Sequence, residues 1–261
     1  MREHAKLPTV YNVTPGGEFT LECPVRPTYE KITLKLTNIT PAQLTALEIR
    51  VDGRPVQRFK DAVRVNAINN YYKRGVTGGY VDFHFTRPEM ASVFEQRMTA
   101  LGTADIKTLT IVGKIDAACV SPAVEAYAIR SEPQPIGLIT KIREFPMSFS
   151  VSGQVDIDKI PLSRAALAAI HLFKSDVSAC TVEANNAKIY ERPKEAGEHD
   201  QSGRNRTPQN AACTHLDFML EGSIREALTT EGIQDFRLRP TIASPGSLDV
   251  VVEYLDGIGG L

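Results

Sequence analysis

The segment Tyr80–Phe85 reads YVDFHF, and a second segment, His215–Leu220, reads HLDFML. In both, apolar residues alternate along the chain, which is typical of a β-strand that buries one face. The residues of the apolar faces are Val81, Phe83 and Phe85 in the first segment and Leu216, Phe218 and Leu220 in the second. An aspartate occupies the same place in each, at Asp82 and Asp217. The two segments therefore look like one strand that occurs twice.

Three further pairs of segments match in the same order along the chain. The pairs are residues 32–36 with 168–172, residues 47–51 with 180–184, and IVGKID at 111–116 with VVEYLD at 251–256. The second pair ends in the turns Asp52-Gly53 and Asn185-Asn186, whose residues accept left-handed backbone conformations. Alternation alone would produce one match by chance between two unrelated β-domains. Four matches in order, with the turns and a following helix, favour an internal repeat.

The repeat predicts a mainly β chain with two tandem eight-stranded jelly-roll β-sandwiches, a double jelly roll, and short helices in loops. We expect one jelly roll over residues 1–134 and another over residues 135–261, joined within SEPQPIG at 131–137. Helices are expected over about 88–101, where Pro88 and Glu89 suit the first turn, and over about 223–230. We expect the polar segment 195–210 to be an exposed loop.

The composition of the 261 residues restricts the class of protein. The net charge of −1 argues against a dedicated nucleic-acid-binding protein, which carries a basic surplus. No apolar run approaches the roughly 20 residues of a membrane-spanning helix, and the N-terminal MREHAKLPTV lacks the apolar core of a secretory signal. The four cysteines form no C-x-x-C pair, so we expect reduced, mostly buried thiols.

The polar residues of the Tyr80–Phe85 segment raise the question of a catalytic or metal site. Asp82 and His84 share one face of the expected strand, but a cupin-type metal site needs an H-x-H pair with a further glutamate and histidine. The second copy carries Met219 in place of His84, so we interpret this face as structural. The chain contains no G-x-S-x-G, P-loop or H-E-x-x-H pattern, and we expect no enzyme and no required cofactor.

A pair of carboxylates is the one candidate for a metal site. In QVDIDKIP at 154–161, Asp156 and Asp158 point to the same side of an extended segment. Two carboxylates in this arrangement suit a hard cation such as calcium, with carbonyl oxygens as the remaining ligands. A solvated strand face is the alternative interpretation, and the usual exposure of aspartate favours it.

Several strings of the sequence are specific enough to suggest a family. They are VDGRP at 51–55, FHFTRPEM at 83–90, QRMTALGT at 96–103, DFMLEG at 217–222, IQDFRLR at 233–239 and VVEY at 251–254. In this order they resemble the major capsid protein of corticoviruses, which are tailless icosahedral phages with double-stranded DNA and an internal lipid membrane. The resemblance extends from about Tyr29 to Leu255 and rests on unusual strings and not on general motifs.

The resemblance implies a double jelly-roll coat protein of the virion shell, made in the cytoplasm of a bacterial host. In that family three copies form a pseudo-hexagonal homotrimeric capsomer. The expected partners are neighbouring capsomers, penton and minor capsid or membrane proteins, and the viral membrane beneath, without direct contact to nucleic acid. Calcium is associated with virion stability in such phages, and Asp156 and Asp158 are our candidates for such a structural ion.

Two other functions compete with that of a coat protein. A spike-like jelly-roll protein that binds a receptor or carbohydrate would need an aromatic binding platform, and the chain has no tryptophan. A cupin-like metalloenzyme would need a histidine-rich inner face, which the five scattered histidines do not supply. A coat protein needs only rigid β-domains, two similar halves and loops for contacts, and the sequence favours it.

Overall fold

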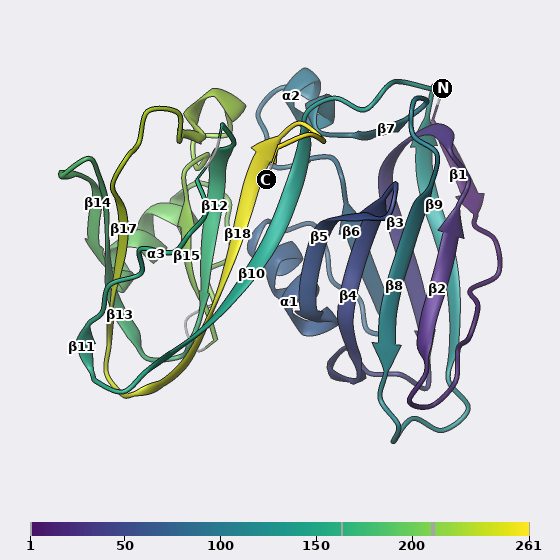
Figure 1. The fold of residues 1–261 in the computed structure, drawn as a ribbon, viewed down its shortest axis with the longest axis horizontal. Helices are drawn as coiled ribbons and strands as arrows, with labels where there is room; N and C mark the ends of the chain where they lie inside the picture. Colours follow the sequence, from purple (N-terminus) through teal and green to yellow (C-terminus); the bar gives the residue numbers. More distant parts are fainter. Residues whose placement is uncertain (1, 163, 210–211, 261) are drawn as a thin grey trace. The chain divides into compact units, whose positions relative to one another are not determined.

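The computed structural model describes residues 2–162, 164–209 and 212–260, and consists mainly of β-strands (Figure 1). The chain divides into two compact units, Met1–Ile142 and Arg143–Leu261. This division lies after the boundary that we predicted between residues 134 and 135. Strand β10 (Ile139–Phe149) crosses the division, so its first residues belong to the first unit and the rest to the second.

The first unit contains two sheets. Its strands before β10 are β1 (Glu3–Lys6), β2 (Glu18–Cys23), β3 (Arg26–Thr37), β4 (Leu44–Val51), β5 (Arg54–Asp61), β6 (Tyr80–His84), β7 (Leu101–Thr103), β8 (Leu109–Ile115) and β9 (Ala123–Ser131). One sheet has the order β1-β9-β3-β6, with β7 also paired to β3. The other runs β2-β8-β4-β5, and the opening of β10 pairs in parallel with β5.

The second unit also contains two sheets. Its strands after β10 are β11 (Gly153–Gln154), β12 (Ala166–Phe173), β13 (Val177–Ala184), β14 (Ala187–Pro193), β15 (Thr214–Asp217), β16 (Leu228–Thr229), β17 (Phe236–Ile242) and β18 (Gly246–Asp256). One sheet has the order β10-β18-β12-β15, with β16 also paired to β12. The other has the order β11-β17-β13-β14.

Both units have the same strand order. Without the short β7 and β16, the first, eighth, third and sixth strands of each unit form one sheet. The second, seventh, fourth and fifth strands form the other. This is the order of an eight-stranded jelly roll, and the prediction of a double jelly roll is confirmed.

The registers place the two copies of the opening segment in equivalent positions. Val81 of β6 lies opposite Leu34 of β3, and Leu216 of β15 lies opposite Ile170 of β12. The two turns also correspond. Their residues have positive φ angles of 48° at Asp52, 77° at Gly53, 50° at Asn185 and 65° at Asn186. Both turns join the fourth and fifth strands of a unit, as a two-residue hairpin requires.

The fourth sequence match was wrong. Residues 111–115 lie in β8, which pairs with β2 and β4, whereas residues 251–256 lie in β18, which pairs with β12. By position in the sheets, β8 corresponds to β17 and β9 corresponds to β18. The error has a simple physical cause, because alternation identifies a half-buried strand without identifying its neighbours.

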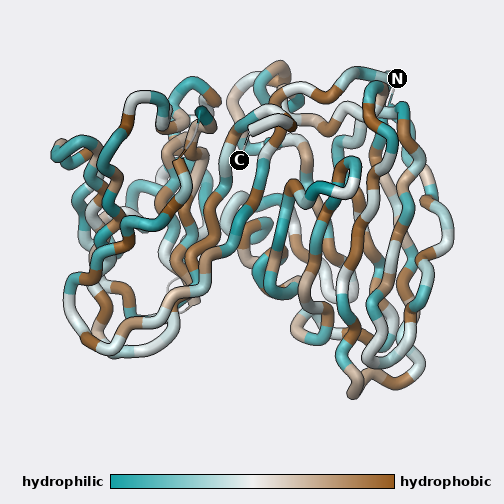
Figure 2. Tube along the Cα trace, in the orientation of Figure 1, coloured by the Kyte–Doolittle hydropathy of each residue, from teal (hydrophilic) through white to brown (hydrophobic). Residues whose placement is uncertain are grey.

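Apolar side chains from both sheets fill each jelly roll. Figure 2 shows hydrophobic residues alternating with hydrophilic ones along many of the strands. In the second unit the core comes from facing positions in both sheets. Its fully buried members include Leu167, Ile170, Leu172, Val182, Leu238, Val250, Val252 and Tyr254. Burial of each such side chain contributes roughly 1.5–3 kcal/mol, so these faces fix the register of the strands.

The helices differ from the prediction. Helix α2 (Val93–Met98) is much shorter than residues 88–101, because Ser92 caps its first turn by accepting a hydrogen bond from the Glu95 amide. The helix expected near 223–230 is only the 3₁₀ turn η2 (Ile224–Glu226). The loop expected at 195–210 instead contains helix α3 (Lys194–Gly203). In the described chain, no helix is long and apolar enough to cross a membrane.

Helix α1 (Ala62–Tyr71) was not predicted, yet it occupies the same place in the first unit as α3 does in the second. Each follows the fifth strand of its unit and precedes the sixth. A side-chain amide of each helix donates to a backbone carbonyl of that sixth strand. Asn69 Nδ2 lies 2.7 Å from the Asp82 oxygen, and Gln201 Nε2 lies 2.7 Å from the His215 oxygen. The repeat therefore extends to the helices.

Candidate functional site

The segment after β6 carries a buried cluster of charges, so our interpretation of Glu89 as part of a helix start was wrong. The Glu89 carboxylate accepts two hydrogen bonds from Arg74, from Nε at 3.0 Å and Nη2 at 2.6 Å. Arg87 Nη1 lies 3.3 Å from the same carboxylate, and the guanidinium of Arg74 lies 4.4 Å from the centre of the Tyr72 ring. The side chains of Arg87 and Glu89 are each 1% exposed. The cluster fixes the chain between α1 and α2.

The polar face of β6 has structural contacts. Asp82 Oδ1 accepts a hydrogen bond from Thr33 Oγ1 at 2.5 Å and lies 3.3 Å from Lys31 Nζ. Burial lowers the pKa of His84 to about 2, with further contributions from the positive charges of Arg74 and Lys31. The matching aspartate of the second unit, Asp217, is also paired, because its Oδ2 lies 2.9 Å from Arg206 Nε. These partners support the structural interpretation of the aspartate in both copies.

A second buried cluster lies on three adjacent strands of the second unit, and the sequence did not predict it. His171 Nδ1 on β12 lies 2.7 Å from His215 Nδ1 on β15, and His171 Nε2 lies 2.9 Å from Glu253 Oε1 on β18. All three residues are buried. Burial, and then the neighbouring His171, lower the pKa of His215 well below its ordinary value. One signal was visible, since His171 and Glu253 each interrupt an apolar strand.

The two calcium candidates lie beside Ile157, which forms an isolated β-bridge with Leu238. Both aspartates are exposed. Asp156 Oδ1 accepts a hydrogen bond from Arg239 Nε at 2.6 Å, and Arg239 also contacts Glu183. Thus one of the two carboxylates is already neutralised by a guanidinium. Among residues 2–162, 164–209 and 212–260, no group of three or more histidine, cysteine, aspartate or glutamate residues could hold a metal ion. The calcium site stays a prediction.

The expectation for the cysteines is confirmed. All four, Cys23, Cys119, Cys180 and Cys213, are free and buried. Burial raises the pKa of both Cys23 and Cys180 to about 12, which keeps these thiols protonated at neutral pH. They pack as small apolar side chains.

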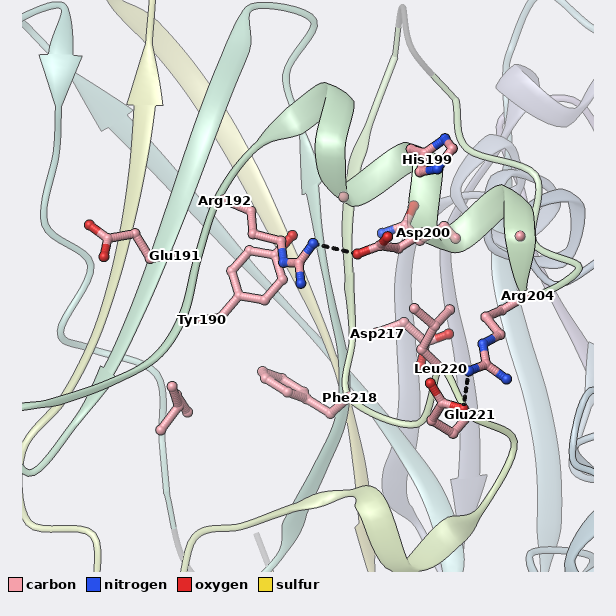
Figure 3. Close-up of a pocket in the computed structure, with 14 residues that line it drawn as sticks. Tyr190, Glu191, Arg192, His199, Asp200, Arg204, Asp217, Phe218, Leu220 and Glu221 are labelled. Atoms are coloured by element: carbon pink, nitrogen blue, oxygen red, sulfur yellow. Dashed lines mark hydrogen bonds and ion pairs between the residues drawn. The ribbon is translucent and has the colours of Figure 1, made fainter.

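An open cleft of about 830 Å³ lies in the second unit, lined by parts of β14, α3 and the end of β15 (Figure 3). Two ion pairs line it. Arg192 Nη1 lies 2.5 Å from Asp200 Oδ2, and Arg204 Nη2 lies 2.6 Å from Glu221 Oε2. The cleft is also lined by apolar and aromatic side chains: Ile189, Tyr190, Phe218 and Leu220. Because these carboxylates are paired with guanidinium groups, the cleft suits the binding of a partner better than acid–base chemistry.

Comparison with known proteins identifies the family across both units. The model of the viral coat protein P2 N-terminal domain matches residues 4–132, and that of the viral coat protein P2 C-terminal domain matches residues 139–258. The chain is 30% identical to the major capsid protein P2 of Pseudoalteromonas phage PM2, over 98% of this chain and 97% of that protein. These matches cover most of the chain and confirm the resemblance noted in the sequence.

Comparison with solved structures supports the same family and fold. The crystal structure of the major capsid protein P2 from bacteriophage PM2 matches with a TM-score of 0.95 at 28% identity, over 100% of both chains. A chain from the structure of Sulfolobus Turreted Icosahedral Virus matches with a TM-score of 0.71 at 9% identity, over 97% of this chain and 90% of that one, which shows a shared fold. With two matched domains and one strand order in each, the chain belongs to the viral coat protein P2 family.

Proposed function

We propose that the chain is the major capsid protein of an icosahedral, membrane-containing phage or a related prophage, and that it forms the capsid shell of the virion. The observation that carries this function is the pair of jelly rolls with one strand order, each matched by a domain of the viral coat protein P2 family. The family consists of structural proteins, so the chain acts by assembly and not as an enzyme. Paired charges and packed cores in both units suit a rigid building block.

We further propose that the assembling unit is a homotrimer with a pseudo-hexagonal outline. Three copies of a chain with two similar jelly rolls present six similar domains around one axis. A heterologous contact repeated by a three-fold rotation closes into a ring. Neighbouring capsomers, penton and minor capsid proteins, and a membrane under the shell are the proposed partners.

Light scattering and electron microscopy of the purified protein test this function. The expected result is a homotrimer at neutral pH whose negatively stained images show pseudo-hexagonal particles. A chain that stays monomeric at high concentration, or that binds glycans without assembling, would contradict the proposed function. The measurement needs no knowledge of the host.

Calcium is proposed as a structural ion near Asp156 and Asp158. Two exposed carboxylates on one segment support it, while the Arg239 contact to Asp156 opposes it by supplying positive charge. The test compares the melting temperature of the assembled protein with calcium and with a chelator, in the unchanged chain and in Asp158→Asn. Calcium stabilisation that is lost in the variant supports the site. Equal stabilisation of both proteins would place the ion elsewhere.

A further inference from the structure

Strands β14 and β1 are two of the edge strands in the part of the chain that the structure describes. Strand β14 ends the sheet β11-β17-β13-β14, and β1 ends the sheet β1-β9-β3-β6. Most of β14 is exposed, and Ile189 in it is a large apolar residue with 43% of its surface exposed. An edge strand presents unpaired N–H and C=O groups, and so it is a template for pairing with another strand.

The equivalent edge of the first unit is paired. Strand β5 corresponds to β14, since each is the fifth strand of its unit. The opening of β10 pairs with β5 in parallel, with Ile142 opposite Gln57, and Gln57 Nε2 donates to the Thr140 oxygen at 3.0 Å. The fifth strand of the first unit is therefore covered by the opening of β10, whose residues there, up to Ile142, belong to the same unit.

The contact extends to the segment after β6. Arg87 Nε donates a hydrogen bond to Thr140 Oγ1 at 3.3 Å, so the opening of β10 is also held by this segment. In the second unit, β15 takes the place of β6, and the residues after it line the open cleft beside β14 (Figure 3). The cleft therefore lies where the first unit holds the opening of a first strand.

The strand that would fill this place is the first strand of a unit, and β1 is that strand in the first unit. One edge of β1 pairs with β9, and its other edge is unpaired in the described sheet. We infer that β14 of one copy pairs in parallel with β1 of a second copy, beside the cleft. This inference rests on the proposed homotrimeric capsomer and identifies one contact between its copies. The contact joins different surfaces of two copies, so it is heterologous and can close a ring.

Disulfide cross-linking tests the pairing in the assembled protein. Ile189→Cys in β14 is combined in turn with Glu3→Cys, His4→Cys, Ala5→Cys and Lys6→Cys in β1. We expect at least one pair to give covalent dimers and trimers on a denaturing gel after mild oxidation, because only residues close in register reach disulfide distance. Each single variant serves as a control, since a heterologous contact brings no residue next to its own copy.

The matched control pair is Val120→Cys with Val151→Cys, whose exposed fractions are 76% and 59% in the two units. We expect no cross-link from it. A trimer in light scattering without any link between Ile189→Cys and β1 would overturn the inference and leave the proposed function intact. A chain that never assembles would instead overturn the proposed function.

A charged substitution provides a second test that does not depend on register. Ile189→Asp adds a negative charge at the proposed contact, and we expect association to weaken at least tenfold while circular dichroism stays unchanged. Val151→Asp, at another exposed apolar residue of the same unit, should leave association unchanged. Equal association of both variants would count against pairing at β14.

Discussion

At the scale of single residues, several buried ionisable groups contact partners that are distant in sequence. Glu89 lies fifteen residues after Arg74, and His171 lies 44 residues before His215. The sequence predicted that Asp82 and Asp217 play one structural role, because the repeat aligns them. It did not predict the partners of Glu89, since only the folded chain brings Arg74 to it. A local sequence pattern predicts on which face of a strand or helix a side chain lies, but it does not predict contacts with residues far away in the sequence.

Neutralising Glu89 tests the importance of the buried cluster. Glu89→Gln keeps the size of the side chain and removes the negative charge between Arg74 and Arg87. We expect the free energy of unfolding to fall by about 3–5 kcal/mol, because one partner of a buried ion pair is lost. Urea denaturation followed by circular dichroism measures the change. Glu221→Gln is the control, since its pair with Arg204 is about half exposed and should change stability by less than about 1 kcal/mol.

The buried histidine pair predicts a pH dependence of stability. The folded pKa of His215 is lower than the unfolded value of about 6.5, so the unfolded chain binds more protons below that pH. The contribution of neutral His215 to the free energy of unfolding is complete above pH 6.5, and it is lost progressively as the pH falls below that value. We expect His215→Gln to flatten the decline of unfolding free energy between pH 7.5 and pH 5, as urea titrations would measure. His199→Gln, at an exposed residue, should keep the original slope.

At the scale of elements, the sequence predicted the strands better than the helices, of which only α2 falls within an expected range. Alternation located β3, β4 and β6, and the Asp52-Gly53 turn located the hairpin between β4 and β5. Helix α1 has the sequence AVRVNAINNY, in which valine and asparagine have modest helix propensity. It forms where Asp61 caps its first turn by accepting from the Arg64 amide, and where Asn69 reaches β6. Contacts outside the helix therefore decide its formation.

Strand β8 offers a test of packing on the buried face of the sheet β2-β8-β4-β5. A Cβ atom at Gly113 would lie 2.6 Å from the Phe19 ring and 2.7 Å from Leu47 Cδ2, both in the core. We expect Gly113→Ala to destabilise the chain by about 1–3 kcal/mol, since these side chains must move in a packed interior. Thermal unfolding measures the loss. The matched change Gly137→Ala meets no atom within 4 Å and should leave the melting temperature equal or slightly raised. Equal effects of both variants would contradict this account of the packing.

At the scale of the whole molecule, the internal repeat predicted two jelly rolls. The prediction succeeded because three of the four matched segment pairs lie in equivalent strands. Its one mistaken pair, 111–116 with 251–256, shows why topology was harder to predict than the repeat. Short sequence strings suggested the resemblance to a coat protein, and the family matches confirm it. The pairing of β5 with the opening of β10 had no visible signal, because edge pairing depends on the arrangement of strands in space. That pairing is also what identifies β14 as a candidate contact between copies.

Assembly through β14 predicts that thermal stability depends on protein concentration. A partner that binds only the folded chain stabilises it by mass action, so a hundredfold rise in concentration should raise the melting temperature by about 5 °C. Circular dichroism and fluorescence cover the micromolar range needed. Ile189→Asp should melt below the unchanged chain throughout that range, because it weakens the proposed contact, whereas Val151→Asp should follow the unchanged chain. A concentration-independent melting temperature in a chain that light scattering shows to be trimeric would mean that the contacts between copies add no stability to the fold.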